Sequence, residues 1–159
     1  MSRSPLGYKP DLPGPALLGF IACAAMVRRA AFLAVGGFDE IVRFPGEEAR
    51  VAIDLAAAGW GLAYVDDVVV HHHPSPQRDS PDRRQASIAR SRLLTAAMRR
   101  PWKFVLHETL HHLTSRSTGR AGVVSAIPGL VPALRARRRT TRRIEMQLVQ
   151  LQSNEQQIS

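Results

Sequence analysis

The sequence predicts an α/β domain followed by a basic, mostly helical extension. Between residues 16 and 77, short apolar runs typical of strands alternate with helical patterns. After residue 78 the apolar residues have helical spacing and stand among arginines. We therefore expect an extended lead-in over residues 1–15, an α/β part over 16–77, a helical basic extension over 78–134, and a basic then polar tail over 135–159.

Prolines and glycines set the boundaries of the elements expected in the first half. Prolines and glycines make residues 1–15 a loop or extended lead-in, and residues 38–45 read as a loop. Two helices are expected, each closed by glycine: residues 29–35, before Gly36 and Gly37, and residues 46–58, before Gly59. Apolar runs predict three strands, over residues 17–27, 60–65 and 68–71.

The second half predicts helices over residues 83–99, 101–113 and 144–151. In the second of these we expect Leu106, Leu110 and Leu113 to face inward. Residues 119–134 are apolar, but Gly122, Pro128, Gly129 and Pro132 interrupt them, so we do not expect a single straight helix there.

The formal charge of +9 is unevenly distributed. Residues 1–77 carry a net charge of −2, residues 78–143 carry +13, and the tail carries −2. The middle segment therefore predicts a surface that attracts anions, such as phosphates or membrane headgroups. Aromatic residues are scarce among these arginines, which argues against stacking of nucleic-acid bases.

Cysteine usage and hydropathy bound the class of protein. One cysteine, Cys23, excludes an internal disulfide framework, and its alanine neighbours indicate a small buried side chain. We identify no signal peptide, and the apolar runs 16–27 and 121–134 are too short to span a bilayer. We expect a cytoplasmic protein, peripheral at most to the inner face of the membrane.

Residues 27–76 carry a family resemblance. They read VRRAAFLAVGGFDEIVRFPGEEARVAIDLAAAGWGLAYVDDVVVHHHPSP. The order is an Arg-Arg-x-x-Phe run, a Gly-Gly-Phe-Asp-Glu run, two acids at the head of a helix, and a strand that closes with histidine. This order resembles the second half of a family 2 glycosyltransferase catalytic domain. A looser likeness extends back to residue 13 and forward to residue 102.

The resemblance implies the C-terminal part of a GT-A fold and an inverting transfer of sugar from a nucleotide-sugar donor to a hydroxyl acceptor. In the family the second acid of the pair is the general base, which corresponds to Glu48, with Glu47 beside it. A carboxylate at this place takes the proton of the attacking hydroxyl. Asp39 and Glu40 would lie near the acceptor. Two acids in a first turn also complement the helix dipole without any catalytic role.

Two positions depart from the family pattern. Many members have Asp where this chain has Arg50, and Arg where it has Asp54. The exchanged charges keep an i, i+4 spacing that permits a pair on the helix surface. We therefore treat Arg50 and Asp54 as structural.

The resemblance also implies a divalent metal, Mn²⁺ or Mg²⁺, and places His71 where many GT-A enzymes have a metal-binding histidine. A neutral imidazole at a strand end suits Mn²⁺. The alternative is that His71, His72 and His73 only form hydrogen bonds in a loop. The family's donor half, with its Asp-x-Asp motif, has no counterpart in this sequence. We therefore expect a truncated chain without activity on its own.

Two alternative functions remain. Residues 107–111 read HETLH and fit the H-E-x-x-H pattern of zinc hydrolases, in which His107 and His111 bind zinc and Glu108 is the base. The sequence offers no third ligand at the expected spacing. The other alternative is a non-catalytic module that binds anions or a membrane surface through the arginines.

Overall fold

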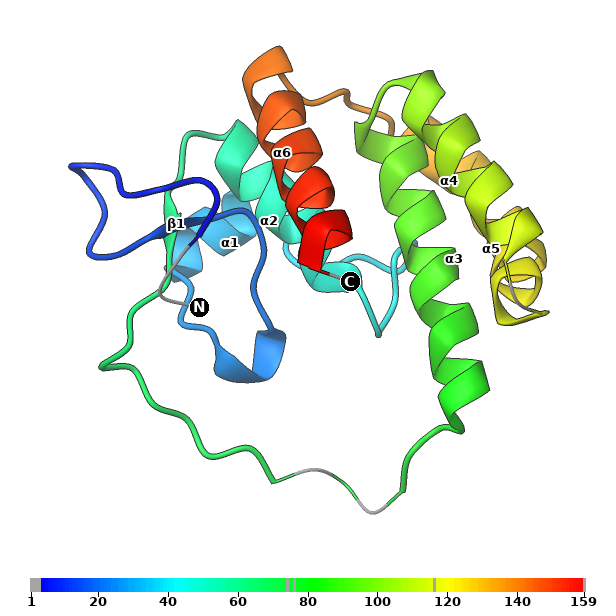
Figure 1. Cartoon of the computed structure of the whole chain (residues 1–159), viewed down its shortest axis with the longest axis horizontal. Coiled ribbons are helices and arrows are strands. Elements are labelled where there is room, and N and C mark those ends of the chain that lie inside the picture. Colours follow the sequence, from blue (N-terminus) through cyan, green and yellow to red (C-terminus); the bar gives the residue numbers. More distant parts are fainter. Residues whose placement is uncertain (1–3, 74, 76, 116, 159) are drawn as a thin grey trace. The chain divides into compact units, whose positions relative to one another are not determined.

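The computed structural model describes residues 4–73, 75, 77–115 and 117–158. Within these ranges the chain forms six α-helices, one short 3-10 helix and one two-stranded sheet (Figure 1). Contacts divide the chain into two compact units. Unit 1 comprises residues 1–37, 51–73 and 140–159, and unit 2 comprises residues 38–50 and 74–139.

The predicted α/β fold, a C-terminal part of a GT-A domain, is wrong for this chain, which is mostly helical in its described residues. Within the described ranges the only strands are β1 (Ala16–Leu17) and β2 (Leu62–Ala63), which pair antiparallel. The other apolar runs form no strand, and Ile21, Met26 and the valines at 68–70 are exposed. A run of strand-forming residues needs a neighbouring strand for its backbone hydrogen bonds. The described residues supply only this short pair.

Unit 1 contains three helices and the small sheet. Helix α1 (Arg29–Ala34) ends as predicted at Gly36 and Gly37, whose φ angles are 80° and 53°. Helix α2 (Glu47–Ala57) begins in unit 2 and continues in unit 1, and Gly59 follows it with φ 88°. The two predicted helices of this region are confirmed because their glycine stops act locally.

Two apolar clusters stabilise unit 1. Val51 and Leu55 of α2 pack with Ala31 of α1. Ile53, on another side of α2, packs with Leu18 and with Ile144 of α6 (Arg142–Ile158). Helix α6 is longer than the predicted segment 144–151. It begins at Arg142, and the polar residues after 151 continue the helix to Ile158.

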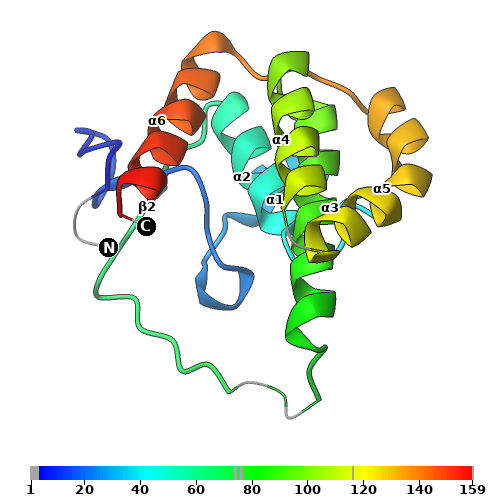
Figure 2. The same ribbon diagram turned by 45° about the vertical axis from the view of Figure 1, so that its right-hand side comes forward.

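Unit 2 consists of residues 38–46, the first turn of α2, and three helices. These are α3 (Pro81–Arg99), α4 (Trp102–Thr114) and α5 (Ser117–Arg135), seen from a second side in Figure 2. The Ser80 hydroxyl caps α3 by accepting the Arg83 N–H, and Pro81 occupies the first turn. The core of the unit joins Val42 to the following residues of α3 and α5: Leu93, Leu94, Ala97, Met98, Ala126 and Ala133.

Helix α5 is one continuous helix, contrary to the prediction. Pro128 and Pro132 lie on its exposed side, and its buried side carries small residues, among them Gly122 and Gly129. A Cβ at Gly122 would lie 2.5 Å from Ala89 Cβ and 2.8 Å from the Ala86 carbonyl oxygen. The glycines therefore allow a close approach of α5 to α3, and this packing outweighs the helix-breaking tendency of the prolines.

Helix α4 exposes the face that was predicted to be buried. Leu106 and Leu110 are 62% and 61% exposed, and Leu113 is also exposed. His112 is the buried residue instead, and it shares a pocket with Ala89 of α3 and Gly119 of α5. The prediction was wrong because helical spacing of leucines identifies a stripe but does not determine what covers it.

None of the helices within the described ranges combines the length and the apolar character that a bilayer span requires.

Gly122→Ala should destabilise the protein by about 1–3 kcal/mol, because the added methyl group forces α5 away from the α3 backbone. This loss outweighs the gain in helix propensity. Chemical denaturation measures it, with the exposed position Val124→Ala as a control that stays within about 0.5 kcal/mol of the wild type. Equal stability of both variants would contradict the close packing.

Candidate functional site

The residues between α1 and α2 line an open pocket of about 330 Å³. All of its lining residues belong to unit 2. They are Phe38, Asp39, Glu40, Val42, Arg43, Phe44 and Glu47. Three of the four carboxylates that the sequence analysis assigned to an acceptor or catalytic role therefore share one pocket.

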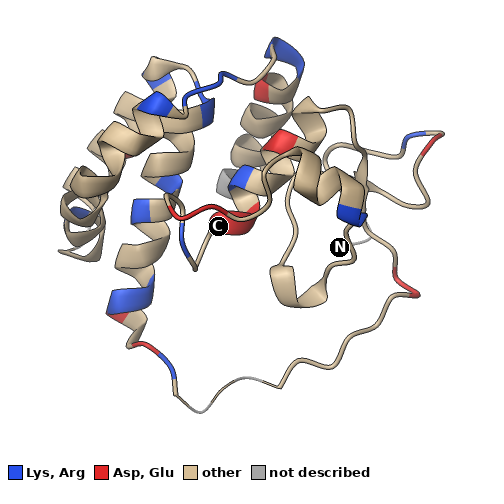
Figure 3. Ribbon diagram, turned by 180° about the vertical axis from the view of Figure 1, so that it is seen from behind, with Lys and Arg blue, Asp and Glu red and all other residues tan. Residues whose placement is uncertain are grey.

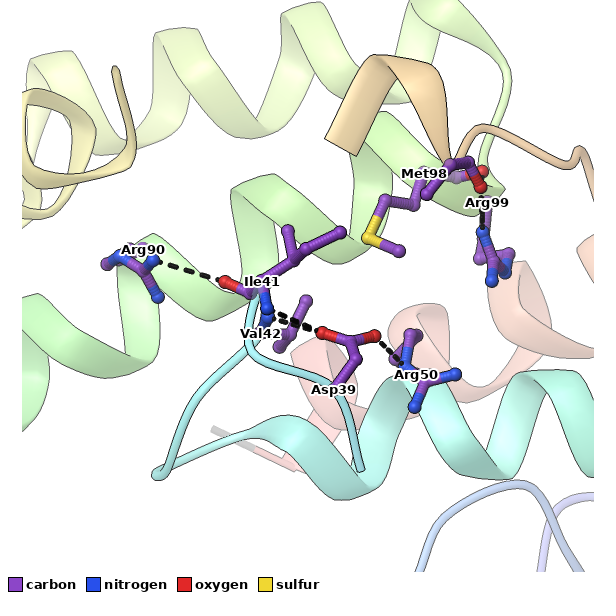
Figure 4. A network of polar contacts seen from close by, with 8 residues as sticks. Asp39, Ile41, Val42, Arg50, Arg90, Met98 and Arg99 are labelled. Carbon is purple, nitrogen blue, oxygen red and sulfur yellow. Dashed lines mark hydrogen bonds and ion pairs between the residues drawn. The ribbon is translucent and has the colours of Figure 1, made fainter. Parts of the chain in front are cut away.

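Asp39 organises this segment with both of its carboxylate oxygens. Oδ1 accepts the N–H groups of Ile41 and Val42, both at 2.8 Å, which closes a turn. Oδ2 lies 2.8 Å from Nε of Arg50 in α2, as Figure 4 shows. Arg50 is 3% exposed, so its guanidinium meets Asp39 in a buried place. Asp39 thus acts first as the anchor of the pocket wall.

The same segment is tied to α3 by side-chain contacts. Arg90 donates from Nη2 to the Ile41 carbonyl at 3.1 Å, and the Ser91 hydroxyl donates to the Arg43 carbonyl at 3.0 Å. Burial, and then the charge of Arg43, lower the pKa of Arg90. Val42 is fully buried in the core of unit 2. The backbone of the pocket is therefore held from both α2 and α3.

Glu47 begins α2 directly after Gly46, which has a φ of 109°. Its side chain is buried, at 9% exposure, and its Oε2 has no hydrogen-bond partner among the residues that the structure describes. Burial raises the pKa of Glu47, and the charge of Glu48 raises it further. The N–H groups of Glu47 and Gly46 offset part of this rise. The result is a carboxylate that is a stronger base than an exposed one.

Glu48 is partly exposed in the same first turn and does not line the pocket. The resemblance had assigned the base to Glu48, whereas the geometry distinguishes Glu47. Glu40 is exposed at the rim. When two adjacent carboxylates have different surroundings, their pKa values differ, and the one with the higher pKa accepts a proton more readily.

The pocket also contains residues that the sequence analysis did not select. The rings of Phe38 and Phe44 are exposed, and the guanidinium of Arg84 in α3 lies 5.6 Å from the Phe44 ring centre. Their positions in the sequence could have identified them. Phe38 stands between the Gly-Gly pair and Asp39, and Phe44 precedes the proline before α2. Exposed aromatic rings beside carboxylates suit a ligand with both apolar and hydroxyl-bearing faces.

His71 lies in unit 1, in an exposed segment without regular structure, and so do His72 and His73. The strand that was to hold His71 is not formed. Across residues 4–73, 75, 77–115 and 117–158, no three His, Cys, Asp or Glu residues come together as a group that could hold a metal ion. The residues present do not fit the divalent metal that the resemblance implies, so we derive no chemical step through one.

The HETLH segment lies in α4. His107 and His111 are exposed, while Glu108 points to the other side, where its Oε2 lies 3.5 Å from Nε2 of His112. Burial lowers the pKa of His112, and Glu108 opposes that shift. The glutamate therefore faces a third histidine outside the motif, whose Nε2 forms no hydrogen bond within the described residues. No third zinc ligand lies near the motif in the described part of the chain.

Comparison of the chain with protein-family models, with curated proteins and with solved structures found no match in any of the three.

Glu47→Gln should stabilise the protein at pH 7 but not at pH 4. The pKa of Glu47 is higher in the folded state than its unfolded value of 4.5, so the folded protein holds the proton more tightly. The contribution of this carboxyl group to the free energy of unfolding is therefore fully present below pH 4.5. That stability is lost as the pH rises through the folded value. Glutamine, which does not ionise, removes this loss at pH 7. Urea denaturation at both pH values tests this. A gain of equal size at pH 4 would contradict the raised pKa.

Proposed function

We propose that this chain supplies the acceptor side of an inverting glycosyl transfer, from a nucleotide-sugar to a hydroxyl acceptor. The observation that carries this proposal is the gathering of Asp39, Glu40 and Glu47 in one pocket. The family resemblance implies the same roles for these residues, Asp39 and Glu40 near the acceptor and Glu47 beside the general base. A donor half with the nucleotide-binding site has to come from elsewhere.

The chemistry of the pocket supports a sugar-like acceptor. Glu40 offers an exposed carboxylate for hydroxyl groups, and the exposed faces of Phe38 and Phe44 offer apolar contact for the C–H face of a ring. Asp39, held by Arg50, fixes the spacing between these groups. Rigid positioning of this kind lowers the entropic cost of bringing the acceptor to the base.

The base belongs to the pair Glu47 and Glu48. As the acceptor oxygen attacks the anomeric carbon, a carboxylate takes the hydroxyl proton, the bond to the nucleotide diphosphate breaks, and the configuration inverts. Burial and the raised pKa of Glu47 favour it over Glu48 for this step. The Oε2 of Glu47 is buried without a hydrogen-bond partner among the described residues, so no other group stabilises the ionised form at that atom.

The test joins the full chain to the donor half of a family 2 glycosyltransferase and measures sugar transfer to simple alcohol and glycoside acceptors. Glu47→Gln should lower the rate by about 10²–10⁴-fold, the usual loss when a general base is removed. Asp54→Asn, on the same helix outside the pocket, is the matched control and should keep the rate. A complex that transfers no sugar, or a Glu47→Gln variant with the wild-type rate, would contradict the proposal.

A further inference from the structure

The outer face of α5 carries an exposed apolar stripe. Val124, Ile127, Val131 and Leu134 recur at the spacing i, i+3, i+7 and i+10, which places them on one side of the helix. They are 64, 58, 57 and 44% exposed. The opposite side, with Gly122 and Ala126, is buried. Helix α5 therefore has two apolar faces, and only one of them is used for packing.

Helix α4 of the same unit has a second stripe. Trp102, Leu106, Leu110 and Leu113 recur at i, i+4, i+8 and i+11, and each is exposed. The helices α3, α4 and α5 contact one another, so the two stripes are what remains outside after the unit has packed. No described segment of the chain covers them.

The charges along the α5 stripe have a single sign, and the one carboxylate of α4, Glu108, is turned toward the mostly buried His112. Residues 109–144 contain eight arginines and no aspartate or glutamate. Exposed arginines stand at both ends of the α5 stripe, Arg120 before it and Arg135, Arg138 and Arg139 after it. Figure 3 shows the ribbon of α5 largely free of charged residues between its ends, with arginines in the segment that follows it.

We propose that the outer faces of α4 and α5 bind the surface of an anionic lipid bilayer. An apolar helix face flanked by arginines inserts among acyl chains while its cations contact headgroup phosphates. The Trp102 indole, with the Arg137 guanidinium 4.2 Å from its ring centre, pairs an aromatic body with a cation as interfacial side chains do.

Charge complementarity selects lipid over a second copy of the chain. Pairing of two α5 stripes would bring Arg120, Arg135 and their neighbours of both copies together with no carboxylate in this segment to offset them. An anionic bilayer neutralises the same arginines. The inference rests on α4 and α5 alone and does not depend on the glycosyl-transfer proposal.

Sedimentation of the full chain with vesicles tests the proposal. The vesicles contain phosphatidylcholine alone or phosphatidylcholine with about 30% phosphatidylglycerol, where the anionic lipid supplies the surface charge. The wild type should bind the anionic vesicles and not the neutral ones, and binding should weaken as salt rises. Ile127→Ser with Val131→Ser should reduce binding at least about tenfold, because these two apolar side chains would no longer be buried in the bilayer.

The matched control is Val69→Ser with Val70→Ser, which changes two exposed apolar side chains of unit 1. This control should bind as the wild type does, and circular dichroism should give the wild-type helix content for both variants. Three results would overturn the proposal: no binding to anionic vesicles, binding unchanged in the Ile127→Ser and Val131→Ser variant, or a dimer that this variant abolishes in place of vesicle binding.

Discussion

The ion pair between Asp39 and Arg50 holds together the segment on which the candidate site depends. Arg50 is almost completely buried in α2, and Asp39 is its partner from the segment before that helix. The other oxygen of Asp39 accepts the N–H groups of Ile41 and Val42. Replacement of Asp39 takes away a charge partner of the buried Arg50 guanidinium, and such losses destabilise a protein. Asp39 therefore links the turn at Ile41 and Val42 to α2, while Arg90 and Ser91 hold the same segment from α3.

This constraint explains the unequal surroundings of the acids. With Asp39 turned toward Arg50 and Val42 in the core, the backbone from Phe38 to Gly46 wraps the start of α2 and buries Glu47. Glu48, one position further on, remains partly exposed. The base proposed for glycosyl transfer thus owes its raised pKa to the same fold of the chain that gathers Asp39 and Glu40.

The sequence predicted the helices better than the strands, for physical reasons. Glycines after residues 35 and 58 are signals within one turn of the helix that they end. The Ser80 cap with Pro81, two residues before the predicted start of α3, is a local signal of the same kind that was not used. A strand depends on a distant partner, and residues 18–27 and 68–71 have none among the described residues. The α/β prediction failed for this reason.

Packing faces were also beyond local prediction. The leucines of α4 have ideal helical spacing, yet His112 is the residue that packs. The continuity of α5 depends on Gly122 and Gly129 meeting α3, which a proline count does not reveal. The carboxylates of the pocket were selected through the order of the Gly-Gly-Phe-Asp-Glu run and the acid pair. Their convergence, and the part of Arg50 in it, required the structure.

A double-mutant cycle on Asp39 and Arg50 tests most directly whether this pair sets the site. The variants are Asp39→Asn, Arg50→Met and the combination, and denaturant unfolding gives the stability of each. If the pair holds the segment, the coupling free energy is at least about 1 kcal/mol, and the double variant is more stable than the sum of the single losses implies. Strictly additive losses would show that the two side chains act independently and would contradict the account.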